Sequence, residues 1–229
     1  MSVLFLVRHG QASVEGDDYD WLSDLGAEQC RELGRFWLEL GLDFDRVVIG
    51  PRRRHRQSHD EVATLFRQAG RPWPEAELLP ELDEHHGPQV LDHHRETLLP
   101  EVSLPDDGNF MKRYLRLFRL GMERWTQGEI ETPEPHEDWR SFRQRVSKGL
   151  DLLCDGGERS ERIVAFTSGG FVAAAAGAVL ELNDRRILEL SFGMRNASVS
   201  EVRFSPERGR GVVSINVVPY REPRLLTFV

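Results

Sequence analysis

The sequence has 229 residues and a net charge of −8, from 38 Asp and Glu against 30 Lys and Arg. A chain of this length can enclose one full hydrophobic core, so we expect a single domain over residues 1–229. The negative charge argues against a general nucleic-acid-binding protein, because no acidic tail masks a separate basic domain. Apolar residues make up 39% of the chain and charged residues 30%, which argues against disorder.

The cysteines and the N-terminus predict a cytoplasmic protein. Cys30 and Cys154 are the only cysteines, too few for a disulfide framework in a chain this long. The N-terminus, MSVLFLVRHG, has an apolar run of five residues without a basic segment before it. We therefore expect neither a signal peptide nor a membrane-spanning segment.

Strands and helices alternate along the first part of the chain. The apolar run 3–7 predicts a buried strand that ends at Arg8-His9-Gly10. A helix is expected from a Ser23 N-cap to a stop at Gly41, and a second strand ends at Gly50-Pro51. An arginine-rich helix follows that strand. The apolar residues with helical spacing are Leu25, Leu33, Phe36, Trp37 and Leu40 in the first helix, and Val62, Leu65, Phe66 and Ala69 in the second.

The middle of the chain predicts loops and then two amphipathic helices. Residues 70–108 are rich in Pro, His and acidic residues with little periodicity, and we expect loops there. A helix is expected over about 109–125, with an apolar stripe that includes Phe110, Met111, Tyr114, Phe118, Met122 and Trp125. Another is expected over 139–154, with Trp139 and Phe142 in the core.

The last third predicts an α/β fold. Residues 162–180 read as a strand, a Ser-Gly-Gly turn and a helix of small residues. The alternating segments 197–204 and 211–218 predict a pair of strands. Because strands alternate with helices through most of the chain, we expect a three-layer α/β/α sandwich around a mostly parallel sheet.

Polar side chains follow three of the expected strands. These strands end at Arg8-His9-Gly10, at Gly50-Pro51 before a run of arginines, and at Thr167-Ser168-Gly169-Gly170. In parallel sheets, ligands bind beyond the carboxyl ends of the strands. A histidine, arginines and a helix N-terminus suit an anionic phosphate.

A succession of motifs carries a resemblance to a known family. LVRHGQAS, LSDLGAEQC, FDRVVIGPRRRHRQS, LDEHHG, WRSFRQRV and FTSGG occur in that order. In this the chain resembles the histidine phosphatase superfamily, whose fold is phosphoglycerate mutase-like. The resemblance spans about residues 3–204, and it implies a helical or loop insertion at about 87–137.

The resemblance implies a role for four residues. His9 would be the nucleophile that forms a phosphohistidine, for which its imidazole must be neutral and held in one tautomer. Arg8 and Arg54 would bind the phosphate oxygens. Glu84 would handle the proton of the leaving group, with a pKa raised by partial burial. Glu81 and Asp83 compete with it for this role.

The chain departs from the family pattern at three places. Most of the family carries Ser-His-Gly at the third strand end, where this chain has Thr167, Ser168 and Gly169. Ser168 thus stands where a second phosphate-binding histidine is expected. Its hydroxyl and the backbone N–H of Gly169 can still bind phosphate, but a cationic donor is lost. Gly50 replaces a common Ser, and Glu15 or a neighbour falls where many members have Asn.

These features predict a phosphate-monoester hydrolase that is slow or specialised and needs no metal or cofactor. Losing one transition-state donor typically costs about 10²–10³ in rate, which need not abolish activity. The expected partner is a small phosphorylated substrate, and the oligomeric state is left open. The alternative is a catalytically impaired relative that binds a phosphorylated ligand. A phosphoglycerate mutase is less favoured, because HHGPQV after Glu84 lacks a basic pattern.

Two further hypotheses concern Ser168 and the loop histidines. Ser168 resembles the nucleophile of a strand–Ser–helix turn, but Phe166 replaces the Gly of that motif and no histidine follows His136. His85, His86, His93 and His94 lack the spacing of a helical metal motif, so we expect solvated loop histidines. One of these four is our first candidate to replace the missing cationic donor.

Overall fold

The computed structural model describes residues 1–13, 20–102, 110–154, 160–220 and 222–228. Within these ranges the strands form one sheet in the order β3-β2-β4-β1-β5-β6. The strands are β1 (Ser2–Arg8), β2 (Arg46–Ile49), β3 (Ala76–Leu78), β4 (Arg162–Thr167), β5 (Val199–Ser205) and β6 (Gly209–Val217). Strands β1 to β4 run parallel to one another. Strand β5 runs antiparallel to both β1 and β6. The sheet is therefore mostly parallel, as predicted.

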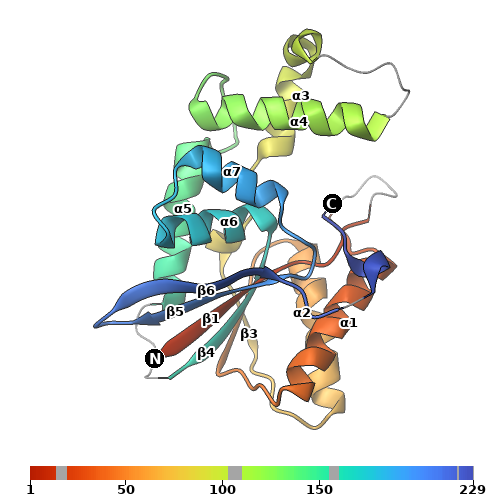
Figure 1. Cartoon of the computed structure of the whole chain (residues 1–229), viewed down its shortest axis with the longest axis vertical. Helices are drawn as coiled ribbons and strands as arrows, with labels where there is room; N and C mark the ends of the chain where they lie inside the picture. The colour runs from red at the N-terminus through yellow and green to blue at the C-terminus, as the bar shows by residue number, and fades with distance from the viewer. Residues whose placement is uncertain (14–19, 103–109, 155–159, 221, 229) are drawn as a thin grey trace.

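Helices cover both faces of this sheet (Figure 1). On one side lie α1 (Asp24–Glu39) and α2 (Arg53–Gln68); on the other lie α5 (Trp139–Cys154), α6 (Gly169–Val179) and α7 (Asp184–Phe192). The two layers arise because successive side chains of a strand point to opposite faces. In β1, Leu4 and Leu6 belong to the apolar core under α5 and α6, whereas Phe5 and Val7 belong to the core under α1 and α2. The predicted three-layer α/β/α sandwich is confirmed.

The expectation of loops over residues 70–108 is wrong for much of the stretch 70–102, whereas residues 103–108 lie outside the described residues. This stretch contains β3 at the sheet edge, two short 3₁₀ turns, η1 (Pro80–Leu82) and η2 (Leu99–Glu101), and the helix α3 (Gly87–Leu98). Pro88 stands in the first turn of α3, where its missing N–H costs no hydrogen bond. Few apolar residues mark this helix, because it packs mainly on α4 (Phe110–Gln127) rather than on the sheet. Leu91, Leu98 and Leu117 form the small apolar cluster between these two helices.

The described aromatic residues predicted to lie in the core on α4 and α5 pack in apolar clusters. Trp139 and Phe142 of α5 are buried in the main core, together with Met122 and Trp125 of α4. Tyr114 and Phe118 pack against the cluster between α3 and α4, while the side chains of Phe110 and Met111 lie outside the described residues.

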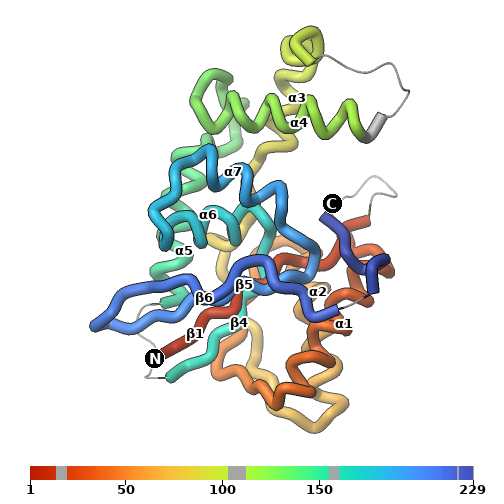
Figure 2. Tube along the Cα trace, viewed as in Figure 1, coloured from red at the N-terminus to blue at the C-terminus, as the bar shows by residue number. Residues whose placement is uncertain are grey.

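The C-terminal segment returns to the N-terminal half of the chain, beside α1 (Figure 2). It contains the short turn η3 (Pro223–Leu225). Gln29 of α1 donates through Nε2 to the Leu225 carbonyl at 2.8 Å and to Thr227 Oγ1 at 2.8 Å. In the described part of the chain, no helix is long and apolar enough to cross a membrane.

Candidate active site

The strand order brings three predicted motifs to one edge of the sheet. Because β4 lies between β2 and β1, the residues that follow these three parallel strands are neighbours in space. The His9 N–H donates to the Thr167 carbonyl at 2.9 Å, and the Gly50 N–H donates to the Phe166 carbonyl at 2.9 Å. The segments after β1 and β2 are thus tied to the end of β4.

His9 is buried at the end of β1, and only 4% of its surface is exposed. Its Nδ1 lies 2.7 Å from the Gly10 carbonyl oxygen, which can only accept, so Nδ1 carries the proton and Nε2 keeps its lone pair. Burial lowers the pKa of His9 well below its ordinary value, and Arg54, Arg8 and His55 lower it further. The imidazole is therefore neutral and held in one tautomer.

The positive charges of both predicted arginines act on His9 and help to lower its pKa. Arg54, in the first turn of α2, is buried, and its Nη1 lies 3.5 Å from Asp20 Oδ1. Arg8 donates through Nη1 to the carbonyl of Phe228 at 2.7 Å and to that of Met194. A β-carbon at Gly169 would lie 3.2 Å from Arg8 Nε, so the first residue of α6 packs directly on this guanidinium.

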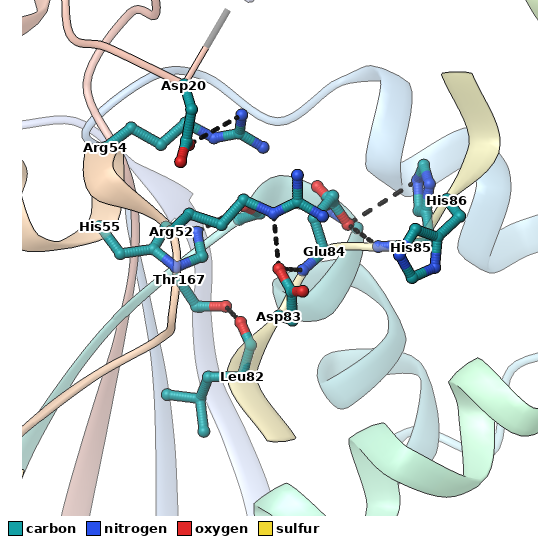
Figure 3. Close-up of polar contacts among 12 residues, drawn as sticks. Asp20, Arg52, Arg54, His55, Leu82, Asp83, Glu84, His85, His86 and Thr167 are labelled. Atoms are coloured by element: carbon teal, nitrogen blue, oxygen red, sulfur yellow. Dashed lines mark hydrogen bonds and ion pairs between the residues drawn. The ribbon is translucent and has the colours of Figure 1, made fainter. Parts of the chain in front are cut away.

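Glu84 faces the N-terminus of α6. Its Oε2 accepts the Gly170 N–H at 3.1 Å. Its Oε1 accepts the His85 N–H at 3.0 Å (Figure 3). Burial raises the pKa of Glu84, but His85, these two N–H groups and Arg54 lower it to about 2. The expectation of a raised pKa is therefore wrong, because burial is outweighed by donors and positive charge aimed at the carboxylate.

The two competitors of Glu84 are engaged elsewhere. The Glu81 carboxylate pairs with Lys148 Nζ at 2.7 Å. Asp83 Oδ1 accepts from Arg52 Nε at 2.5 Å and from the Glu84 N–H at 2.7 Å (Figure 3). Asp83 thus supports the backbone of Glu84.

Arg145 of α5 fixes the same loop from the other side. Its Nη1 donates to the carbonyls of Glu81 and Asp83, each at 2.8 Å, and its Nη2 donates to the Glu84 carbonyl at 3.3 Å. The guanidinium is held in turn by the Glu137 carboxylate. A fork of this kind holds a loop in one conformation, because several donors of one rigid group act together.

Ser168 is fully buried at the N-cap of α6, and a histidine that the sequence did not single out lies against it. His55 Nε2 is 2.6 Å from Ser168 Oγ, and the ring centroids of His55 and His9 are 5.9 Å apart. His55 was missed because it stands in an arginine-rich run that is typical of a solvated helix start. Gly50 and Ser168 could have indicated the position of this ring, because both depart from the family pattern and both lie against His55 in space.

The expectation of solvated loop histidines is wrong for three of the four, because His85 is largely buried and His93 and His94 lie on a helix. His85 Nε2 lies 3.8 Å from Glu84 Oε1, and the His86 ring stacks on the ring of His136. His93 and His94 lie on α3, where both contact Glu131. Among the described residues, no group of three or more His, Cys, Asp or Glu side chains could hold a metal ion. Glu15 lies outside the described residues.

The chemistry of this edge matches what the resemblance implies for phosphate. Ser168 has a histidine partner, but among the described residues no carboxylate is bonded to the other nitrogen of that histidine, His55 Nδ1. The carboxylate that would complete a Ser–His–Asp arrangement is therefore lacking there. A neutral histidine beside two guanidiniums and a helix N-terminus suits a phosphoryl group instead.

Comparisons with known proteins agree with this interpretation. Residues 107–217 match the model of the Histidine phosphatase superfamily (branch 1). No curated protein sequence matches the chain. This match covers a little under half of the chain, and over these residues the chain is similar to that family.

Solved structures show the phosphoglycerate mutase-like fold over nearly the whole chain. A putative alpha-ribazole-5'-P phosphatase from Escherichia coli is 16% identical, with a TM-score of 0.65 over 95% of this chain and 98% of that one. A phosphoglycerate mutase from Bacillus anthracis is also 16% identical, with a TM-score of 0.65 over 94% and 92%. A mutant phosphoserine phosphatase from Entamoeba histolytica, in complex with phosphoserine, is 17% identical, with a TM-score of 0.62 over 94% and 97%.

Proposed function

We propose that this chain hydrolyses a phosphate monoester through a phosphohistidine at His9, without a metal ion. The observation that carries this proposal is the bond between His9 Nδ1 and the Gly10 carbonyl, which leaves Nε2 as a nucleophile. In-line attack on phosphorus by Nε2 breaks the P–O bond to the leaving group, and water then attacks the phosphohistidine. The family match and the names of the two similar phosphatases support a phosphatase reaction.

Arg8, Arg54, Ser168 and Gly169 would bind the phosphoryl oxygens. The guanidiniums offset the negative charge that the phosphoryl group brings beside His9. Ser168 offers a hydroxyl, and Gly169 offers one of the N–H groups at the start of α6 that have no partner within the helix.

Glu84 would carry the proton that the leaving oxygen needs. Arg54 is one of the groups that lower the pKa of Glu84, and a phosphoryl dianion beside Arg54 opposes that effect. Substrate binding therefore raises the pKa of Glu84 and lets it take up a proton. Glu84 then donates this proton to the leaving oxygen and accepts one from the attacking water.

The test is hydrolysis of para-nitrophenyl phosphate from about pH 4 to 8, together with trapping of a phosphoenzyme from phosphoramidate. We expect turnover and an acid-labile phosphoenzyme in the parent, and neither in His9→Ala. His93→Ala is the matched control, because His93 is exposed on α3 and contacts Glu131. A parent that is no more active than His9→Ala and takes up no phosphate would overturn the proposal.

A second candidate is a catalytically impaired relative that binds a phosphorylated ligand. The observation that favours it is Ser168, which stands where the resemblance implies a cationic histidine. Binding of phosphoserine or 3-phosphoglycerate without turnover would support it. Both ligands are phosphate monoesters that occur in similar structures.

A further inference from the structure

Two departures from what the resemblance implies meet around the end of β4. Ser168 takes the place of a histidine, and Gly50 takes the place of a common Ser. The imidazole of His55, which the sequence did not single out, lies between them. His55 comes from the first turn of α2, and its Nε2 contacts Ser168 Oγ at 2.6 Å. The imidazole is thus present at this edge of the sheet, but it comes from the neighbouring strand end.

Gly50 makes the room for this ring. A β-carbon at position 50 would lie 2.4 Å from His55 Nδ1 and 2.9 Å from His55 Cε1. Both distances are far below ordinary van der Waals contact, and His55 is fully buried among its neighbours. The ring therefore fits only beside a glycine. A second imidazole in place of Ser168 would have to occupy the space that His55 already fills.

Both ring nitrogens of His55 face an oxygen. Nδ1 makes no well-aligned hydrogen bond among the described residues, but a hydrogen bond with the Gly50 backbone raises the pKa of His55. Nε2 lies 2.6 Å from Ser168 Oγ, and this contact suits either tautomer of the ring. In the tautomer with the proton on Nε2, the ring donates to Ser168 Oγ and the hydroxyl proton is left to donate to a ligand.

We propose that His55 donates through Nε2 and is a positioning residue that acts through Ser168: it orients the Ser168 hydroxyl as a donor to the phosphoryl group on His9. The pair replaces the histidine that the family places at position 168. This inference rests on the proposed function for the identity of the phosphoryl acceptor. The ring centroids of His9 and His55 are 5.9 Å apart, so the pair lies beside the nucleophile.

The pair supplies a hydrogen bond but no charge. Burial lowers the pKa of His55 well below its ordinary value, and Arg54 on α2 and Arg52 at its N-cap lower it further. Glu84 and the Gly50 backbone oppose this shift only in part. His55 therefore stays neutral beside two guanidiniums. Donation from its N–H polarises the Ser168 hydroxyl and strengthens it as a donor.

The experiment is a double-mutant cycle of His55→Ala and Ser168→Ala. We expect each single variant to lower kcat/KM for para-nitrophenyl phosphate by about 10²-fold, since each removes the same donor. The kcat/KM of the double variant should be no lower than that of the less active single variant, because the effects of residues that act as a unit do not add. Independent roles would instead multiply to about 10⁴-fold, and that result would overturn the proposal.

His59→Gln is the matched control. His59 lies one turn further along α2, is also buried, and accepts a hydrogen bond from Trp73 Nε1 at 3.0 Å, which a glutamine can also accept. If His55→Ala is as active as His59→Gln, the inference is wrong. Ser168→Ala removes a single oxygen atom. Even if His55→Ala does not fold, a Ser168→Ala variant as active as the parent overturns the inference.

An exchange variant tests the same inference in the opposite direction. His55→Ala/Ser168→His moves the imidazole to the position that the family uses, and we expect at least a tenfold gain over His55→Ala alone. Ser168→His alone should be impaired, because the two rings would overlap. No gain in the exchange variant would contradict the inference.

Orthovanadate binding separates this inference from the proposed function. We expect His55→Ala and Ser168→Ala each to weaken orthovanadate binding by about tenfold, without a further loss in the double variant. That pattern in a parent without turnover would support the inference and reject the proposed function. Turnover in the parent, with orthovanadate binding unchanged by His55→Ala, would support the proposed function and reject the inference. A parent that neither turns over substrate nor binds orthovanadate would reject both.

Discussion

Gly50→Ala is the substitution that most directly tests the arrangement around His55. Gly50 is not among the residues with positive φ, so the cost of an alanine there is steric. The new β-carbon would lie 2.4 Å from His55 Nδ1 and 2.9 Å from the Leu82 carbonyl oxygen. The ring must move by about 1 Å to restore ordinary contact. Such overpacking of a buried site costs about 1–3 kcal/mol, and we expect the free energy of unfolding to fall by that amount.

Urea unfolding followed by circular dichroism measures this cost, with Gly211→Ala as the control. A β-carbon at Gly211 would meet nothing within 4 Å, so that variant should be near neutral. In a His55→Ala background the contacts with the ring are gone, whereas the 2.9 Å contact with the Leu82 carbonyl oxygen remains. The cost of Gly50→Ala should therefore fall, by about 1 kcal/mol or more. An equal cost in both backgrounds, or a Gly50→Ala variant as stable as Gly211→Ala, would refute the steric reasoning.

The remaining predictions concern Glu84 and the loop that holds it. Glu84→Gln should lower kcat by about 10²–10⁴-fold with an alkyl phosphate, but much less with para-nitrophenyl phosphate, whose leaving group needs no proton. Equal losses of kcat with the two substrates in steady-state kinetics would contradict the role of Glu84 as an acid. The pKa of Glu84 is lowered from 4.5 to about 2, so its ionised form adds stability that is complete above pH 4.5 and is lost as the pH falls toward 2. This contribution is about 3 kcal/mol, and Glu84→Gln should flatten the decline of the unfolding free energy over that window, as measured by urea titrations at several pH values. Arg145→Lys loses the fork that holds the carbonyls of Glu81 and Asp83, so it should lower stability by about 1–3 kcal/mol and lower activity most with the alkyl phosphate; a uniform loss with both substrates would argue against an effect through Glu84.

The elements that the sequence predicts well are those whose apolar pattern is set by the sheet. The buried run of β1 and the helical spacing of α1 and α5 are strong because each element packs against a large core. Ser23 is the N-cap of α1, as predicted, and accepts from the Gly26 N–H at 3.0 Å. Gly41, the predicted stop, has a φ of +64°.

The elements that escaped prediction bury little against the sheet. α3 contributes few buried apolar side chains and packs on α4 rather than on a strand. β3 has only three residues and lies at the sheet edge with its side chains partly or fully exposed. α7 carries a clear start signal, because Asn183 accepts from the Arg186 N–H at 3.0 Å, but its sequence is mostly polar. Periodicity is weak wherever the core contribution is small.

For the site, the sequence predicts which residues gather but not how they are charged or paired. The positions of His9 and Ser168 follow from strand ends that parallel order brings together. The low pKa of Glu84 depends on N–H groups from His85 and Gly170, and the second of these lies 86 residues away along the chain. Such contacts exist only after the fold is formed, so no local pattern can predict them.

His55 illustrates a more general point about motifs at strand ends. Positions 55 and 168 are 113 residues apart, yet they are neighbours because β2 and β4 are paired in register from Arg46 to Ile49. An imidazole needed at this edge of the sheet can therefore come from the start of α2 or from the end of β4. Moving it requires only a small residue at the vacated position and a glycine beside the new ring, which are Ser168 and Gly50. A motif that is broken at one strand end should accordingly be compared with the residues that follow the adjacent strands before its function is taken as lost.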